Sequence, residues 1–361
     1  MIRSFRIQPF RTGIACAALL AGVQAQAAPD HVDITWMSIT NMYFELGDQK
    51  IVADGYITRL PHEIFYSGQS GLGQTQRPVR PDEPAVKEVL DALGGKSAVK
   101  LLLTGHNHFD HSFDTGAWSK LSGARIIGAR TACLQTQAQG IPEKRCTPVV
   151  GGEAVELERG VHMYVVRWNH SGGPELNREL HEPRELEALP VADANGALRA
   201  GVLEDFPNGG GNRAYLFTVD GPRGRFSWFF QDSGSPVDLQ QPIIVDGKNY
   251  GAPLDNLRAA MKAAGVESVD LWIATGGRDM AALVLPVLRP KAYLPVHWDG
   301  LYGAFKAGPP QRYDDPEVTA LLGTQGVRMI VPVQYMDKWR LDKDGIRSVD
   351  NARVKQRLGF R

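Results

Sequence analysis

The sequence predicts an α+β fold in which layers of sheet and helix form a single domain. Short runs of β-branched and aromatic residues at 32–37, 41–46 and 50–54 predict strands, and a Gly-Asp pair supplies a turn between the last two. Residues 84–93 predict a helix, because their apolar residues recur at helical spacing and two glycines follow. Strand pairs interspersed with helices are typical of packed layers of both kinds.

Later segments continue this mixture. Continuous apolar runs at 99–104 and 269–274 predict strands that are covered on both faces. Helices are expected at 254–264 and at 316–322, where Asp315 supplies a cap. Further strands are expected at residues 124–129, 161–168, 213–219, 226–230 and 327–333.

A long polar stretch rich in proline and glycine occupies residues 172–211. A connection of this length in a compact domain is usually functional, so it is a candidate lid insertion. No internal repeat and no linker divides the chain, and residues 28–361 are therefore expected to form one domain.

The composition excludes several classes of protein. The chain has 361 residues, with 40 Lys and Arg against 40 Asp and Glu, and no basic cluster. A balanced charge without a basic patch argues against nucleic acid as a partner and favours a small-molecule substrate. A charged content of 22% and a mean hydropathy of -0.24 exclude a disordered chain and a multi-span membrane protein.

Residues 1–27 match a cleaved secretory signal. Arg3, Arg6 and Arg11 precede a short apolar run at 13–23, and an Ala-Gln-Ala cleavage pattern follows. The apolar run is too short to span a bilayer, so no stable membrane anchor is expected. The sequence therefore predicts a bacterial protein that is periplasmic or secreted.

Export leaves two cysteines, Cys133 and Cys146, in the mature chain. An even pair in an oxidising compartment is a candidate disulfide. The alternative is two buried thiols. Neither cysteine has the spacing to another cysteine that a structural zinc site requires.

The segment TGHNHFDHS, residues 104–112, concentrates four candidate metal ligands directly after a predicted strand. On an extended segment His106 and His108 share one side, because side chains alternate with period two. Asp110 and His111 fall where the chain turns toward a helix and face a second position nearby. Imidazole nitrogen and carboxylate oxygen are ligands of zinc and similar divalent ions. The pattern HxHxDH therefore predicts one loop that supplies ligands to two adjacent metal ions.

Further candidate ligands each follow a strand-like run, which places them on one rim of a sheet. These are His170 after RWN, Asp232 after SWFFQ and His297 after AYLPV, and Asp54 follows KIVA in the same way. This ordered set resembles the metallo-β-lactamase fold superfamily of hydrolases over essentially the whole mature chain. The resemblance implies a four-layer αββα sandwich with the site at one edge of its two sheets.

The resemblance also implies a metal-dependent hydrolase with two divalent metal ions, for which zinc is expected. It assigns the first metal to His106, His108 and His170, the second metal to Asp110, His111 and His297, and a bridging role to Asp232, with Asp54 behind the ligands. A water held by two metals about 3.5–4 Å apart ionises near neutral pH and attacks a carbonyl or phosphorus. Asp110 is the catalytic residue expected to take the proton and return it to the leaving group.

The expected substrate class follows from positions at which this sequence differs from particular branches of the superfamily. Asp232 stands where true metallo-β-lactamases of this fold carry Cys or Ser, and the run DSGSPVD lacks the Tyr of acyl-homoserine lactonases. The forms HNHFDHS, VADGY and PVHWD resemble the branch that includes ascorbate-phosphate lactonase and the phospholipase D acting on N-acylated phosphatidylethanolamine. A phosphodiester, ester or lactone is therefore the expected substrate.

Three alternatives stay open. One is an iron-dependent redox member of the superfamily, similar to a sulfur dioxygenase, although the intact trio of Asp110, His111 and His297 favours hydrolysis. The second is a β-lactamase, and the third is a periplasmic metal- or ligand-binding protein without enzymatic activity. Among residues near the predicted site, Tyr302 and Phe305 are candidate pocket walls, whereas Trp228 is expected in the core.

Overall fold

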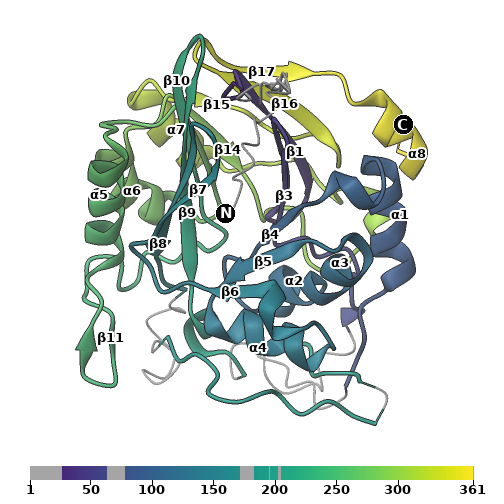
Figure 1. Ribbon diagram of the computed structural model, residues 1–361. Helices are drawn as coiled ribbons and strands as arrows, with labels where there is room; N and C mark the ends of the chain where they lie inside the picture. Colours follow the sequence, from purple (N-terminus) through teal and green to yellow (C-terminus); the bar gives the residue numbers. More distant parts are fainter. Residues whose placement is uncertain (1–26, 63–77, 171–182, 195, 202–204, 361) are drawn as a thin grey trace, which may run out of the picture.

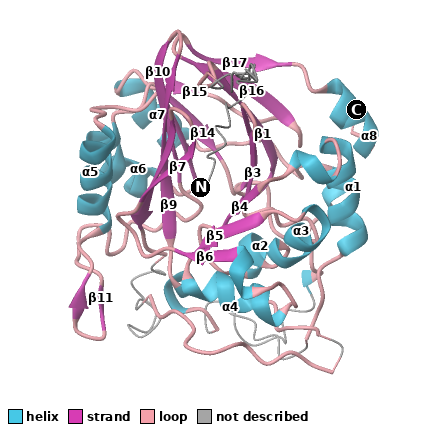
Figure 2. Cartoon of the chain, in the orientation of Figure 1, coloured by secondary structure: helices cyan, strands magenta, loops and turns pink. Residues whose placement is uncertain are grey.

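The computed structural model describes residues 27–62, 78–170, 183–194, 196–201 and 205–360. Two sheets pack face to face in the middle of the molecule (Figure 1). Helices α5 and α6 lie outside one sheet, and α1 and α8 lie on the opposite side of the molecule (Figure 2). The expected four-layer αββα sandwich is therefore confirmed.

Eight strands of the described chain form the first sheet, six from the N-terminal half of the chain and two from near its C-terminus. The pairings from β17 through β3 are antiparallel, whereas those from β3 through β6 are parallel. In spatial order the strands are β17 (Gly345–Val349), β16 (Asp337–Asp342), β1 (His31–Ser38), β2 (Asn41–Leu46), β3 (Gln49–Ala53), β4 (Leu101–Leu103), β5 (Arg125–Gly128) and β6 (Cys146–Pro148).

Seven strands of the described chain form the second sheet, with parallel pairing from β10 through β15 and antiparallel pairing elsewhere. Its order is β15 (Arg328–Met329), β14 (Ala292–Pro295), β13 (Leu271–Ala274), β10 (Gly224–Phe230), β9 (Arg213–Gly221), β8 (Val161–Arg167) and β7 (Ala154–Glu158). A separate short hairpin consists of β11 (Ile244–Val245) and β12 (Lys248–Asn249).

The helices divide between the two outer layers. Helices α3 and α4 pack on strands β4 to β6 of the first sheet, and α5 packs on β8 and β9 of the second. The α-helices are α1 (Glu83–Leu93), α2 (Phe109–Ser112), α3 (Thr115–Ser122), α4 (Arg130–Ala138), α5 (Pro253–Ala264), α6 (Arg278–Leu288), α7 (Pro316–Thr324) and α8 (Ala352–Leu358).

Aromatic side chains from both sheets fill the space between them. Phe44 on β2 lies 5.9 Å from Phe217 on β9 and 5.8 Å from Trp228 on β10, measured between ring centroids. Phe217 and Trp228 stack at 4.5 Å. The predicted core position of Trp228 is confirmed, because its side chain is fully buried.

One predicted strand is much shorter than expected. Residues 327–333 give only β15, which ends at Met329. Pro332 follows closely and has no N–H to donate to a ladder, so the chain leaves the sheet. Val333 beyond it is exposed, although its type favours a strand.

Two predictions fall wholly or partly outside the described residues. Residues 1–26 of the predicted signal are not described, and the candidate lid at 172–211 is described only in part. Within the residues that the structure describes, no helix has the length and apolar character needed to cross a membrane.

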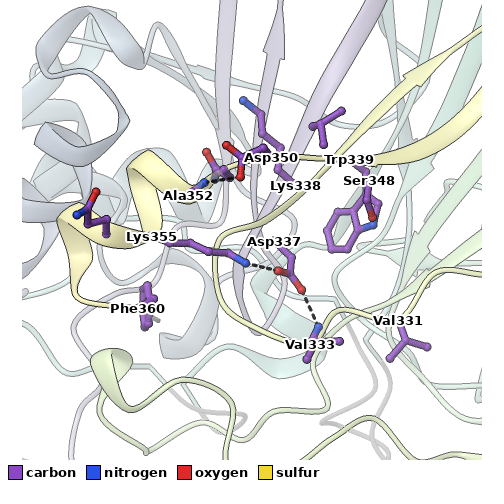
Figure 3. A pocket seen from close by; sticks show the side chains of 13 residues that line it. Val331, Val333, Asp337, Lys338, Trp339, Ser348, Asp350, Ala352, Lys355 and Phe360 are labelled. Atoms are coloured by element: carbon purple, nitrogen blue, oxygen red, sulfur yellow. Dashed lines mark hydrogen bonds and ion pairs between the residues drawn. The ribbon is translucent and has the colours of Figure 1, made fainter.

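A cavity of about 560 Å³ lies between the segment 331–333, β16, β17 and α8. Figure 3 shows Asp337 in its wall, where the carboxylate accepts hydrogen bonds from the Lys355 ammonium at 2.5 Å and the Val333 N–H at 2.8 Å. The described residues that line it include none of the predicted metal ligands. This cavity is therefore separate from the predicted site.

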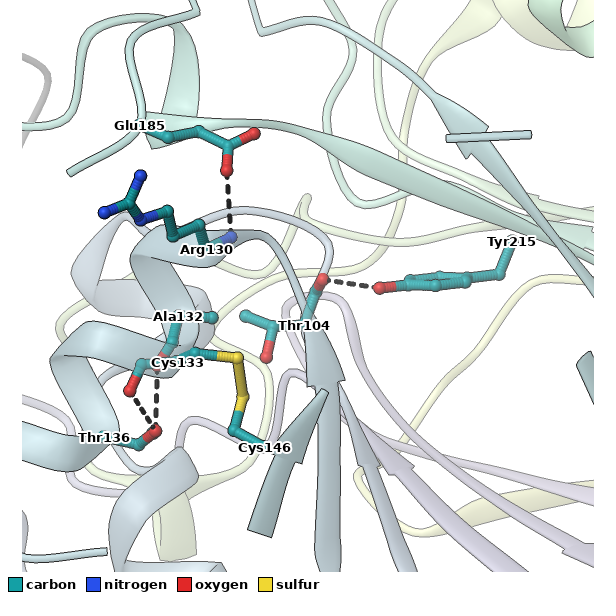
Figure 4. Close-up of a disulfide and its surroundings, with 8 residues drawn as sticks. All are labelled: Thr104, Arg130, Ala132, Cys133, Thr136, Cys146, Glu185 and Tyr215. Carbon is teal, nitrogen blue, oxygen red and sulfur yellow. Dashed lines mark hydrogen bonds between the residues drawn. A yellow bond between two sulfur atoms is a disulfide. The ribbon is translucent and has the colours of Figure 1, made fainter. Parts of the chain in front are cut away.

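A disulfide joins Cys133 on α4 to Cys146 on β6, with 5.4 Å between their Cα atoms (Figure 4). Both cysteines are buried. The bridge attaches helix α4 to the edge strand of the first sheet. Of the two alternatives for this pair, the structure shows the disulfide rather than two free thiols.

Candidate metal centre

The HxHxDH loop connects strand β4 to helix α2. His106 and His108 lie in the loop, whereas Asp110 and His111 lie in the first turn of α2, and all four side chains are buried. A glycine precedes this set for a steric reason. A Cβ atom at Gly105 would lie 2.0 Å from an oxygen of Asp232, so only glycine lets that carboxylate approach the loop.

The other three predicted ligands come from the second sheet. His170 follows β8, Asp232 follows β10 and His297 follows β14. The structure brings all seven predicted residues together in overlapping groups whose ligand atoms lie within 4.8 Å of one another. These groups are His106, His108 and His170; Asp110, His111 and His297; and His106, His111 and Asp232.

The first trio is His106, His108 and His170. Their ring centroids are separated by 4.6 to 4.7 Å. The buried Nε2 of His106 and Nδ1 of His170 have no hydrogen-bond partner among the described residues. The Nε2 of His108 lies 3.2 Å from the carbonyl oxygen of Phe206, which leaves its Nδ1 with a lone pair when Nε2 carries the proton.

The second trio is Asp110, His111 and His297. Oδ2 of Asp110 lies 3.1 Å from Nε2 of His111 and 3.1 Å from Nε2 of His297. The two Nε2 atoms are 3.2 Å apart. Donors about 2.0–2.1 Å from a tetrahedral zinc ion lie about 3.3 Å from one another, so this nearly equilateral triangle fits one face of such a coordination shell.

Asp232 lies between the two trios. Its Oδ2 is 2.7 Å from Nδ1 of His106 and 3.4 Å from Nδ1 of His111. Its Oδ1 is buried without a hydrogen-bond partner in the described chain. A buried, unpartnered carboxylate oxygen beside two rings is costly unless a cation balances it, so the donor set fits divalent metal ions.

The imidazoles of the first trio are neutral at pH 7. Burial lowers the pKa of His106 well below its usual range, and it lowers the pKa of His108 to about 4 and that of His170 to about 3. A neutral imidazole has the free lone pair that metal binding requires.

Charged neighbours favour the charged forms of His111 and Asp110 in the second trio, whereas the pKa of Asp232 shifts toward its neutral form. Burial opposes the charge on His111, but Asp110 and Asp54 raise its pKa well above the usual range. Burial likewise opposes ionisation of Asp110, but His111 and His297 hold its pKa well below the usual range. Burial, reinforced by Asp54, raises the pKa of the Asp232 carboxyl.

Asp54 holds His111 from behind, as the resemblance implied. Its Oδ2 lies 3.0 Å from Nδ1 of His111 and accepts a 2.6 Å hydrogen bond from the Thr40 hydroxyl, while its Oδ1 accepts one from the Gly105 N–H. Asp54 itself has a φ of 60°, an uncommon conformation for a residue with a side chain. A proton held on Nδ1 leaves Nε2 of His111 free to bind a metal.

His297 is positioned by a buried network that the sequence did not reveal. Its backbone N–H donates to the carbonyl of Ile39 at 3.0 Å. The Asp299 carboxylate in turn accepts bonds from the Ile39 N–H and, at 2.6 Å, from the Tyr335 hydroxyl. Arg59 completes the network at 3.6 Å from Asp299. The only signal for it was an aspartate two residues after the last predicted ligand.

The two candidate pocket-wall residues have different surroundings. Tyr302 is partly buried, and its ring stacks 6.2 Å from that of Phe109, which follows His108, so its role in a pocket stays a prediction. The prediction for Phe305 is wrong. Its ring stacks 5.4 Å from Tyr335 and lies 5.5 Å from Phe360, because it belongs to the hydrophobic core.

Comparisons with known sequences give a partial likeness to hydrolases. No family model matches the chain. The chain is similar to a UPF0173 metal-dependent hydrolase of Pyrobaculum arsenaticum, with 27% identity over 140 residues. The match covers 39% of this chain and 51% of that protein, so the chain spans about half the length of the relative.

Solved structures give likenesses at low identity. Igni18, a novel metallo hydrolase from the archaeon Ignicoccus hospitalis, is 14% identical, with a TM-score of 0.47 over 86% of this chain and 99% of its own. YhfI, a metallo-beta-lactamase fold protein from Bacillus subtilis, is 11% identical, with a TM-score of 0.45 over 86% and 99%. The strand order of the two sheets and the packing of the helices on them establish the architecture of this chain.

Proposed function

We propose that this chain is a metal-dependent hydrolase that uses two divalent metal ions, with zinc as the expected metal. The observation that supports this most directly is the pair of ligand trios with Asp232 between them. Neutral imidazoles in one trio and an ionised carboxylate in the other are the donors that zinc prefers. The likeness to a metal-dependent hydrolase supports the same function.

The residues have distinct roles in this proposal. His106, His108 and His170 would hold one ion, Asp110, His111 and His297 the other, and Asp232 both. When bound, two such ions supply an activated water and polarise the oxygen of the attacked group. Asp110 takes the proton from the attacking water and returns it to the leaving group. The nearby His111 and His297 keep this carboxylate ionised beforehand.

The proposed substrate is a phosphodiester, an ester or a lactone. An aspartate at position 232, rather than Cys or Ser, argues against β-lactams. The motif-level resemblance to the branch of ascorbate-phosphate lactonase and N-acylphosphatidylethanolamine phospholipase D supports the wider class. An intact second trio favours hydrolysis over iron-dependent oxidation.

We also propose that the protein is exported and works in the periplasm or outside the cell. The signal-like residues 1–27 support this location, and the disulfide between Cys133 and Cys146 fits an oxidising compartment. The intact mass of the protein purified from its host tests the proposal. A mass that includes Met1 would contradict cleavage.

Metal analysis combined with a substrate panel tests the function. The protein is assayed with bis-p-nitrophenyl phosphate, a simple lactone and nitrocefin, and its bound metals are measured. Zinc with phosphodiester or lactone turnover is expected, and His108→Ala should abolish it. His162→Ala, near the other end of β8 from His170, is the matched control. Iron with oxygen uptake, nitrocefin as the best substrate, or bound metal without turnover would each support a different alternative and contradict this one.

A further inference from the structure

One short segment lies across the HxHxDH loop and contacts the first trio. We call this segment, Phe206–Gly210, the strap; its backbone is kinked at Asn208 and Gly209, which both have positive φ. The backbone N–H of Asn107 donates to the Gly209 carbonyl at 2.9 Å, and its side-chain amide donates to the carbonyls of Gly209 and Gly210 at 3.2 Å. Asn107 lies between His106 and His108, so the strap is bonded to the centre of the motif.

The strap touches every member of the first trio. The Phe206 carbonyl lies 3.2 Å from Nε2 of His108. The Asn208 side-chain oxygen accepts a hydrogen bond from the backbone N–H of His170. Gly209 packs against His106 so closely that a Cβ atom at this glycine would lie 2.8 Å from the Cβ of His106.

The second trio has other supports. His111 is held by Asp54 and Thr40, and His297 by the backbone of Ile39. We propose, on the basis of the proposed two-metal function, that the strap positions the ligands of the first metal alone. Asn208 and Gly209 are its positioning residues, and their loss weakens the first site while the second keeps its affinity.

The conformation of Asn208 suits this role. Its φ of 49° and ψ of 40° lie in the left-handed region, which asparagine tolerates better than most residues. The residue is 2% exposed. Replacing it with alanine leaves the partly buried N–H of His170 without this acceptor, at the point where the chain presents His170 to the trio.

Gly209 offers a second, independent variant. Its φ of 74° is strained for alanine, and the added methyl group would push His106 directly. Gly196 is a matched control, because its φ of 75° imposes the same strain while nothing lies within 4 Å of an added Cβ. A difference between these two alanine variants therefore reports the contact with His106.

The test measures zinc affinity at each site separately, by competition with a chromophoric chelator. His297→Ala removes a ligand of the second trio and His170→Ala one of the first, so each parent reports the other site. In the His297→Ala parent, Asn208→Ala and Gly209→Ala should each weaken zinc binding about 10- to 100-fold. In the His170→Ala parent, the same substitutions should change it by less than about threefold.

Two further variants separate the loss of the strap contacts from other effects of the substitutions. Asn208→Asp keeps a side-chain acceptor and should restore affinity in the His297→Ala parent, while Gly196→Ala should leave it unchanged. Equal weakening in both parents, or no weakening in the His297→Ala parent, would overturn the selective role of the strap. If neither parent nor the wild-type protein binds zinc, the proposed two-metal function fails as well. Thermal unfolding of the metal-free variants checks that each is folded.

Discussion

At the scale of single residues, Asp54 controls which nitrogen of His111 is free. Its carboxylate lies 3.0 Å from Nδ1 of that ring. Asp54→Asn places an amide of the same shape there, which no longer favours a proton on Nδ1. Zinc binding at the second trio should therefore weaken about 10- to 100-fold, measured by chelator competition in the His170→Ala parent. Asp279→Asn, an exposed aspartate of α6, is the control, and equal affinities for both variants would contradict this role.

Single residues also show what the sequence could predict of the site. The seven predicted ligands are distinctive in type and follow predicted strands, so their order alone indicated that they meet. The residues that hold these ligands in place carry no such signal in the sequence. Phe206 acts through a backbone carbonyl, which every residue has. Arg59 and Asp299 lie far apart in the chain, and only the fold brings them to 3.6 Å.

At the scale of elements, Asp114 connects helix α3 to the loop that follows β3. Its fully buried carboxylate accepts hydrogen bonds from the N–H groups of Ile57 and Thr58 at 2.6 and 2.7 Å. Burial raises its pKa from 3.8 to about 6. The folded chain therefore keeps a proton on Asp114 that the unfolded chain releases near pH 4. The protonated Asp114 carboxyl therefore contributes its full stabilisation of the folded state below about pH 4, and this stabilisation is lost as the pH rises through 6.

The shift at Asp114 corresponds to about 3 kcal/mol of unfolding free energy between pH 4 and 7. Asp114→Asn mimics the protonated acid and should remove this pH dependence. Urea unfolding of both proteins at several pH values gives the comparison. The wild-type protein should lose about 3 kcal/mol more than the variant as the pH rises. Parallel curves for the two proteins would show that Asp114 does not titrate in this range.

Helices and strands could be predicted where the local sequence pattern matches the burial of their side chains in the fold. Helix α5 agrees with its prediction to within one residue at its start. The agreement is close because a Pro at the first position and a Gly after the end mark its boundaries. Helix α6 was not predicted. It contains Pro286, and apolar residues also occupy its partly buried positions, such as Leu283 and Val287, so the sequence does not mark which face is buried. Its helical form depends on tertiary packing, which the local pattern does not record.

At the scale of the whole molecule, the disulfide is a covalent link between the helical layer and the first sheet. It joins positions separated by 13 residues. Closing a loop of this size stabilises the folded chain by about 3 kcal/mol on the chain-entropy model. The double variant Cys133→Ser, Cys146→Ser should lose about this much in urea unfolding, and reduction of the wild-type protein should have the same effect. Unchanged stability in both cases would mean that packing alone holds α4 on the sheet.

The metal centre should be the second link across the molecule, because its ligands come from both sheets. His106, His108, Asp110 and His111 follow β4 of the first sheet, whereas His170, Asp232 and His297 follow strands of the second. Metal bound there should therefore stabilise the packing of one sheet on the other. At a free zinc concentration 1,000 times its dissociation constant, each site adds about 4 kcal/mol.

Removing the metal with a chelator should lower the unfolding temperature, and added zinc should restore it. The single-site variants His170→Ala and His297→Ala should each keep part of the effect, since each retains one trio. The double variant His106→Ala, His297→Ala leaves none of the three ligand groups intact, so it should not respond to the chelator and controls for effects of the chelator itself. A wild-type unfolding temperature that is the same with and without chelator would contradict a metal link between the sheets. A response in the double variant would place the stabilising metal elsewhere in the chain.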